Sequence, residues 1–391
     1  MELFLLILGI VMFIGLVIVH ELGHFWVARR NGVVPEEFGI FFPPTLWRKK
    51  MKNGWDFTIN ALPLGGFVKL RGEHDSDTHK GSFGAANDWA KTKIMLAGVA
   101  VNLITALLMF TILAWVGMPT IIPNQFTVKS DTKISQDNLI AQYVEPGSPA
   151  SKTGINRGDT LLSITPSNEQ KKYTINGKTG LRDITKKYAG KQVKITYIRD
   201  GKQHTTITTL RSQAEIDASK KAGEPKGYLG VEPYSLRVQQ STWSAPVVAL
   251  GLSWQVTKLT MQGIGTALKG LGGTIVGGLT DNTTARQNAQ TAASSQVSGP
   301  LGIFFVLQGG ATIGLKFILF IIAIISLTLA IMNVLPVPAL DGGRLYMMLL
   351  SRLTKKKRLT PKMEETIVGW SFLLLLALIA LITFVDIKRF F

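Results

Sequence analysis

The chain has 391 residues, of which 46% are hydrophobic and 17% are charged, and it contains no cysteine. Charged residues make up roughly a quarter of an average soluble protein, so this composition argues against a purely soluble chain. The lack of cysteine excludes a disulfide-stapled scaffold, a cysteine nucleophile and a cysteine-ligated metal site. The net charge of +18 suits either a membrane surface or a nucleic acid. The basic residues gather beside apolar segments, without interleaved aromatic residues, so we expect a lipid bilayer and no nucleic acid as partner.

Several apolar segments are long enough to cross a membrane, which takes about 20 residues at a rise of 1.5 Å each. They cover residues 1–28, 94–118, 315–342 and 366–385. The first segment could instead be a cleaved signal peptide, but such a peptide begins with positive charge, and Met1 and Glu2 provide none. We therefore expect a polytopic α-helical membrane protein with four transmembrane helices.

A further apolar stretch, Ala245–Leu279, is rich in glycine and carries Lys258 and Lys269. It could be a fifth span, but a helix of mixed polarity lies more readily in the plane of the membrane surface. We expect residues 236–300 to form an amphipathic, juxtamembrane helical segment on the outer side.

Lysine and arginine residues near the ends of the spans predict the orientation, because cytoplasmic loops are enriched in them. The short connection between the third and fourth segments contains Arg344, Arg352, Lys355, Lys356, Lys357, Arg358 and Lys362. The loop over residues 29–93 begins with Arg29 and Arg30, which agrees. We therefore expect both loops in the cytoplasm and both chain termini on the extracytoplasmic side of a plasma membrane.

Residues 127–235 change to short β-rich runs separated by turn residues. Ser148 is the predicted N-cap of a short helix, and Asp200-Gly201 predicts a hairpin between residues 193–199 and 204–210. Residues 144–164, V-E-P-G-S-P-A-x-x-x-G-I-x-x-G-D-x-L-L-x-I, closely resemble bacterial PDZ domains. We expect one extracytoplasmic PDZ domain, which either binds a peptide or protein ligand by strand addition or acts as a spacer that gates access by size.

The clearest chemical signal is an H-E-x-x-H pattern in the first apolar segment, formed by His20, Glu21 and His24. Residues four apart share one face of a helix, so both imidazoles can bind one metal ion. Glu21 lies about 100° further round the helix, where it can accept a proton from water at that site. Ionisable residues inside a membrane segment are costly and usually functional, so we prefer this metal site to a merely polar helix interface.

Catalytic zinc needs a third protein ligand and one open position. Asp341, in N-x-x-P-x-P-x-L-D-G, is the candidate, because His74 and His79 lie in a polar loop and His204 in the outer segment. For straight helices entering from outside, His20 and His24 lie about 26 to 32 Å along the first segment and Asp341 about 36 Å along the third. The alternative for Asp341 is a plain helix-ending Asp-Gly turn.

Taken together, H-E-x-x-H, N-x-x-P-x-P-x-L-D-G and the PDZ-like run resemble the site-2 protease family of intramembrane zinc metalloproteases, in particular its bacterial regulator-of-sigma-E subgroup. The resemblance implies one Zn²⁺ per chain held by His20, His24 and Asp341, with Glu21 as catalytic base and Asn333 holding the substrate backbone. It also implies cleavage of single-span membrane proteins, such as anti-sigma factors and signal-peptide remnants, in a bacterial cell membrane. Two features depart from the family pattern. Residues 97–102 lack the proline of A-G-P-x-x-N, and only one PDZ pattern is evident where the best-known members have two.

The cytoplasmic loop predicts a membrane-associated β-sheet. Residues 47–50 and 55–59 flank Asn53-Gly54, a signal for a type I′ hairpin turn, and residues 66–70 form another short strand. In the family that the chain resembles, an edge of such a sheet could pair with an extended substrate beside the metal. Gly65 and Gly66 would permit close approach of that substrate, or they form a plain turn.

Two other classes of function fit parts of the sequence. A catalytically inactive membrane adaptor would use the PDZ-like domain to recruit partners, but it would not need the complete metal-binding pattern. A metal or proton transporter would also place histidine and aspartate inside the membrane. Transporters usually contain internal repeats, and we find none across the four apolar segments. We therefore expect a metalloprotease that acts in regulated intramembrane proteolysis.

Overall fold

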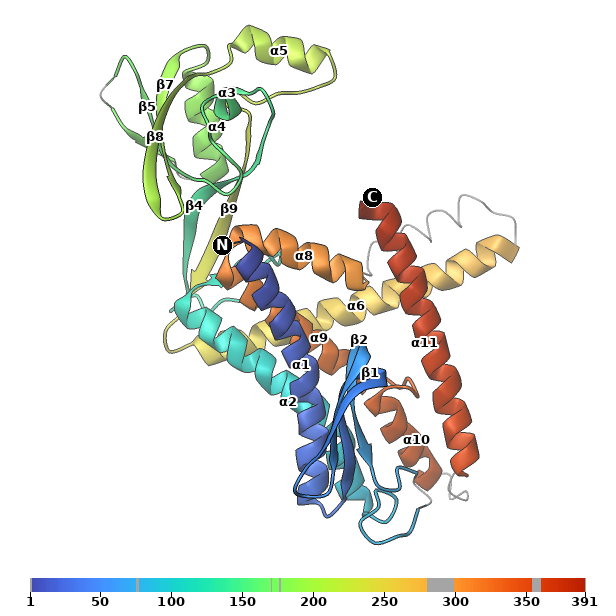
Figure 1. The fold of residues 1–391 in the computed structure, drawn as a ribbon. Helices are drawn as coiled ribbons and strands as arrows, with labels where there is room; N and C mark the ends of the chain where they lie inside the picture. The colour runs from blue at the N-terminus through green and yellow to red at the C-terminus, as the bar shows by residue number, and fades with distance from the viewer. Residues whose placement is uncertain are drawn as a thin grey trace.

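The computed structural model describes residues 2–74, 77–169, 171–175, 177–279, 299–353 and 360–390. Long helices occupy one part of the molecule, and a sheet-rich part lies at the other end (Figure 1). Two long strands, β4 (Lys133–Val144) and β9 (Val231–Gln240), pair with each other and run between the two parts.

Four of the described helices are long and apolar enough to cross a membrane. They are α1 (Glu2–Arg30), α2 (Asp88–Val116), α9 (Leu315–Val334) and the Pro361–Phe384 portion of α11 (Pro361–Phe390). This confirms the expectation of four membrane-spanning helices. Helix α6 (Ala245–Leu279) is continuous but is not among these four, and it runs crosswise to α11 in Figure 1. The alternative of a fifth span at α6 therefore gains no support.

Small residues let α1 and α2 pack closely. A Cβ atom added to Gly23 of α1 would lie 2.9 Å from the backbone oxygen of Ala97 on α2, so the two backbones are nearly in contact. Helix α2 also packs against α9 and α6 through a buried apolar cluster, in which the rings of Phe110 and Phe320 lie 5.8 Å apart. In α11, by contrast, the membrane-spanning window contains no buried residue. The tightly packed centre of the helical part thus consists of α1, α2 and α9.

Strands β1 (Pro35–Lys50) and β2 (Asp56–Leu70) follow α1 and form a two-stranded sheet close to it (Figure 1). Residues 37–40 of β1 pair both with residues 56–59 and with residues 66–69, so they lie between the two halves of β2. The predicted type I′ turn at Asn53-Gly54 is wrong, because that turn needs positive φ at both residues and only Gly54 has it. Residues 51–55 form a longer loop instead.

The chain turns sharply before it reaches Asp341. Helix α9 ends at Val334, and α10 (Asp341–Leu353) begins at Asp341 itself. Pro336 and Pro338 lie between the two helices, and proline both lacks a backbone N–H and clashes with the preceding helical turn. The predicted third segment, residues 315–342, therefore consists of α9, a proline-containing connection and the start of α10, and Asp341 belongs to the first turn of this new helix.

The sheet-rich part has the strand order β3-β9-β4-β5-β7-β8, with β6 paired to β5. Its further strands are β3 (Met118–Pro119), β5 (Thr160–Pro166), β6 (Tyr173–Thr174), β7 (Gln192–Arg199) and β8 (Lys202–Thr209). Its helices are α3 (Pro149–Lys152), α4 (Gly177–Lys187) and α5 (Gln213–Lys221). Leu161, Ile164, Val193 and Ile195 lie fully buried in its core, which is separate from the core of the helical part.

Two local predictions in the sheet-rich part are confirmed. Ser148 caps α3 by accepting a hydrogen bond from the backbone N–H of Ser151. Asp200 and Gly201 have φ angles of 49° and 75°, and they join β7 to β8 in an antiparallel hairpin. Both follow from short sequence patterns that need no distant contact.

Two carboxylates tie distant segments to the helical part. Asp131 accepts hydrogen bonds from the backbone N–H groups of Thr242 and Ser244, just before α6, at 2.8 and 3.1 Å. Asp386 of α11 accepts hydrogen bonds from the N–H groups of Gly299 and Gly302 at the start of α8 (Pro300–Ile313), both at 2.9 Å. These contacts satisfy backbone donors that a helix leaves free at its N-terminus.

Candidate metal centre

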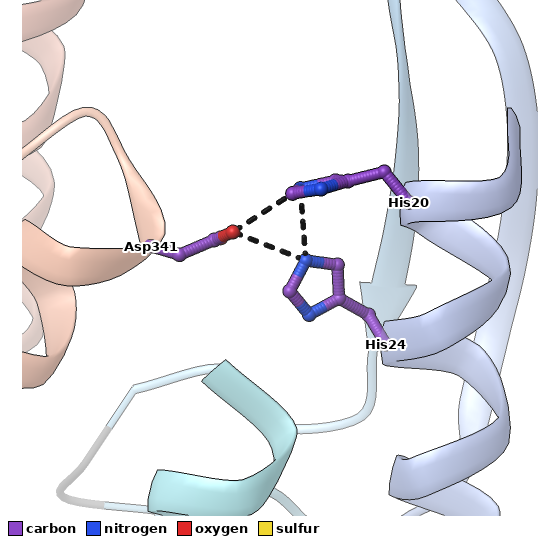
Figure 2. Close-up of side chains that lie close together, drawn as sticks. All are labelled: His20, His24 and Asp341. Atoms are coloured by element: carbon purple, nitrogen blue, oxygen red, sulfur yellow. Dashed lines mark hydrogen bonds and ion pairs between the residues drawn. The ribbon is translucent and has the colours of Figure 1, made fainter. Parts of the chain in front are cut away.

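His20 and His24 lie one turn apart on α1 and point toward Asp341 at the start of α10 (Figure 2). The Nε2 atoms of the two histidines are 3.2 Å apart, and Oδ2 of Asp341 is 3.2 Å from each of them. The two histidines are 8% and 9% exposed. The structure thus brings together, in a nearly equilateral triangle, the three residues that the sequence patterns select from opposite ends of the chain.

The donor atoms of this triangle fit a zinc ion. Ligand atoms about 2.0 to 2.1 Å from a tetrahedral zinc ion lie roughly 3.3 Å from one another. Nδ1 of His24 is 2.7 Å from the carbonyl oxygen of Ile94, which can only accept, so Nδ1 carries the hydrogen and Nε2 has a free lone pair. Oδ2 of Asp341 is buried without a hydrogen-bond partner. A cation held by all three groups would satisfy this acceptor.

Helix α2 supports both histidines with one stripe of residues spaced four apart. The carbonyl oxygen of Ile94 contacts His24, and the side-chain amide of Asn102 lies 3.2 Å from Nδ1 of His20. Between them, a Cβ atom added to Gly98 would lie 2.5 Å from both imidazole rings. The two rings therefore pack directly against a glycine, with a hydrogen-bonding group one turn before it and another one turn after it.

Asp341 is positioned by the two glycines that follow it. A Cβ atom on Gly342 would collide with the backbone of Val334, and one on Gly343 would collide with the backbone of Val337. The first turn of α10 can therefore pack directly onto the Pro-containing segment between α9 and α10. This contact places the backbone of Asp341 at the start of α10, and it gives the two glycines of the L-D-G-G pattern a steric reason.

A cavity of about 470 Å³ lies beside the triangle. Glu21, His24 and Asp341 line it together with residues 66–70 of β2 and with Arg344. Gly66 lies within β2 next to Glu21, because a Cβ atom added to it would be 3.1 Å from Cγ of Glu21. The cavity therefore brings a carboxylate, the candidate metal ligands and a strand backbone around one space that can hold a ligand.

The other two residues predicted to bind substrate, Gly65 and Asn333, are not among the residues that line this cavity. Gly65 is also part of β2, not of a turn, and packs against the ring of Phe42, 3.2 Å from the position of an added Cβ. Asn333 lies in the last turn of α9, and within the described ranges it shares no hydrogen bond with the triangle. Ile94, Gly98 and Asn102 also support the triangle, and in the sequence the only local signal for them is the spacing A-G-x-x-x-N.

Three residues that could hold a metal ion thus lie among helices that are long and apolar enough to cross a membrane. The model of Peptidase family M50 matches residues 8–378, so the chain belongs to this family. It is 29% identical over 384 residues to a Clostridium perfringens protein named "Putative zinc metalloprotease", with 98% of both chains covered. It is 24% identical over 467 aligned residues to "Regulator of sigma-E protease RseP" of Salmonella typhimurium, covering 99% of this chain and 98% of that protein.

Proposed function

We propose that this chain is an intramembrane zinc metallopeptidase that hydrolyses peptide bonds in or near the transmembrane segments of single-span membrane proteins. Its membership of Peptidase family M50 identifies it as a peptidase. The relatives that it matches along nearly their whole length are named as a zinc metalloprotease and as a regulator of sigma-E protease. The observation that carries the proposal is the triangle of His20, His24 and Asp341 among helices that are apolar enough to span a membrane.

In this proposal, His20, His24 and Asp341 hold one zinc ion, and Glu21 is the catalytic base. Bound zinc would supply Lewis-acid polarisation of the scissile carbonyl and would lower the pKa of water to about 7. Glu21 follows His20 on α1 and lines the same cavity as His24 and Asp341. Its carboxylate accepts the proton of the attacking water and later donates that proton to the leaving amine.

The substrate segment has to become extended before it can be cleaved. A transmembrane helix uses its carbonyl groups in internal hydrogen bonds, so the bond to be cleaved is accessible only after local unwinding. Residues 66–69 pair with residues 37–40 on one side, and among the described strands they have no partner on the other. Since this stretch also lines the cavity, its free edge suits an extended substrate. Gly65 and Gly66 have no side chains that could block the approach of a substrate strand to this edge. Asn333 is proposed to hold the substrate backbone.

We further propose that residues 127–235 form one extracytoplasmic PDZ domain that keeps bulky ectodomains away from the membrane site. The resemblance of residues 144–164 to bacterial PDZ domains supports this, as does the separate core of the sheet-rich part. In this role the protein acts on single-span proteins already trimmed on the outer side, such as anti-sigma factors or signal-peptide remnants. Capture of a peptide ligand by strand addition is the alternative role of the domain.

Replacement of Glu21 by glutamine tests the assigned base. Glutamine keeps the size of the side chain but cannot accept the proton, so cleavage of a single-span substrate by purified protein should fall by about 10²- to 10⁴-fold. The zinc content of Glu21→Gln should equal that of the wild type, and a zinc chelator should stop wild-type cleavage. Glu224→Gln, at an exposed position in the sheet-rich part, is the matched control and should remain fully active. Wild-type cleavage by Glu21→Gln would rule out this base.

A further inference from the structure

We infer that Asn102 is a positioning residue of the metal centre, whose side-chain oxygen accepts a hydrogen bond from Nδ1–H of His20. The inference rests on the proposed zinc site and deepens it. Asn102 lies on α2, is 1% exposed, and its amide is 3.2 Å from Nδ1 of His20. The contact is therefore sealed from water, and each polar atom in it needs a partner within the protein.

Metal binding through Nε2 decides which ring nitrogen carries the hydrogen. A neutral imidazole has one N–H, and Nε2 must direct a lone pair at the metal, so the hydrogen belongs on Nδ1. For His24, the backbone carbonyl of Ile94 enforces this form at 2.7 Å. His20 needs an acceptor in the equivalent position, and in the described part of the chain the group hydrogen-bonded to its Nδ1 is the amide of Asn102.

The orientation of the Asn102 amide follows from this requirement. The oxygen and nitrogen of a side-chain amide have nearly the same shape, so they are assigned from their hydrogen-bond partners. With Nδ2 toward His20, the amide donates to Nδ1, which forces the ring hydrogen onto Nε2 and into the triangle. That orientation also leaves Oδ1 of Asn102 buried without a partner. With Oδ1 toward His20, the amide accepts from Nδ1–H, and Nε2 is free for the metal.

A contact with α9 holds the backbone of Asn102 in place. Oγ of Ser326 on α9 is fully buried and donates a hydrogen bond of 2.8 Å to the backbone oxygen of Asn102. One turn earlier, Gly98 leaves room for the His20 ring to approach α2. A histidine ligand oriented by a fixed acceptor loses little freedom when it binds metal, and such partners commonly change metal affinity when removed.

The test is the zinc affinity of the purified full-length protein, measured by competition with a chelator. Asn102→Leu has a similar size but cannot form the hydrogen bond, so we expect its zinc affinity to fall by roughly 10- to 100-fold. Asn102→Asp keeps the acceptor and loses the donor, so its zinc affinity should stay at or above that of the wild type. Thr111→Val, which removes a hydroxyl group bonded to the backbone of Leu107 further along α2, is the matched control and should retain wild-type affinity.

Wild-type zinc affinity in Asn102→Leu would overturn the inference, and so would an equal loss of affinity in the leucine and aspartate variants. The melting temperature of the zinc-free proteins separates loss of affinity from loss of folding. If Asn102→Asp does not fold, the ¹⁵N chemical shifts of the imidazoles in the zinc-loaded wild type decide the question. Hydrogen on Nδ1 of His20 supports the inference, and hydrogen on Nε2 overturns it. A failure of the proposed zinc site itself would give a different result from a failure of this inference. In that case the wild type and His24→Ala would bind zinc equally weakly.

Discussion

Gly98 is the residue whose size the metal triangle constrains most. Any side chain there begins with a Cβ atom 2.5 Å from Cε1 of His20 and from Nε2 of His24, which is closer than atoms can approach. Gly98→Ala should therefore displace both rings and remove zinc from the purified protein, as measured by elemental analysis. Gly15→Ala on α1 is the matched control, because no atom lies within 4 Å of its added Cβ. A full zinc content in Gly98→Ala would contradict the described packing of the rings.

The residues that the sequence could identify are those that belong to short patterns. His20, Glu21 and His24 are recognisable because their spacing places them on one helix turn, and Asp341 because it ends a proline-rich pattern. Ile94, Gly98 and Asn102 were not identified as supports, because their role arises only when α2 packs against α1. A backbone carbonyl such as that of Ile94 leaves no trace in the sequence at all.

For the helices and strands, short sequence patterns predicted where a break or a turn occurs better than they predicted its backbone conformation. Pro336 and Pro338 interrupt the third apolar segment, but only the structure shows that α9 ends at Val334 and that α10 begins at Asp341. The hairpin of β7 and β8 was predicted correctly from Asp200-Gly201, whereas Asn53-Gly54 was not sufficient to fix a type I′ turn. Residues 37–40 of β1 pair with both halves of β2, and no short pattern encodes that pairing.

An ion pair holds two elements of the sheet-rich part together. The carboxylate of Asp159, 1% exposed before β5, accepts hydrogen bonds of 2.8 and 2.6 Å from Nε and Nη2 of Arg199 at the end of β7. These hydrogen bonds raise the pKa of the Arg199 guanidinium. Asp159→Ala should destabilise this part by about 2 kcal/mol, because it leaves a half-buried cation without its partner.

Hydrogen exchange of the full-length protein measures this effect. Backbone amides of β5 and β7 should exchange faster in Asp159→Ala than in the wild type, while those of α1 and α2 should not change, because their core is separate. Asp217→Ala, at an exposed carboxylate in α5, is the control and should exchange like the wild type. Unchanged exchange of β5 and β7 in Asp159→Ala would show that the ion pair contributes little.

For the whole molecule, the sequence predicts how many helices cross the membrane but not how they are arranged. The length of an apolar segment can be read from the sequence without any knowledge of tertiary contacts, and the four predicted segments correspond to four apolar helices of sufficient length. The contacts of α1, α2 and α9 depend on small residues meeting across helices, for example Gly23 against Ala97. The position of α6 across the helical part is likewise a product of packing, to which Phe110 and Phe320 contribute.

The orientation of the molecule can be measured directly, because the chain has no cysteine of its own. Lys52→Cys lies in the loop between β1 and β2, and Lys202→Cys lies at the start of β8, both at exposed positions. With Arg29 and Arg30 on the cytoplasmic side, a membrane-impermeant maleimide added to intact spheroplasts should label only Lys202→Cys. Both variants should react after lysis. Labelling of Lys52→Cys in intact spheroplasts would reverse the proposed topology.

Asp341 connects the C-terminal half of the molecule to the two histidines of α1. The zinc content of a variant that lacks this carboxylate is therefore the most direct test of the proposed metal centre. After dialysis against metal-free buffer, the purified wild type should retain one zinc ion per chain, and Asp341→Ala should retain none. Asp217→Ala should behave like the wild type and controls for the loss of a carboxylate. One zinc ion per chain in Asp341→Ala, held as tightly as in the wild type, would contradict a metal centre formed by His20, His24 and Asp341.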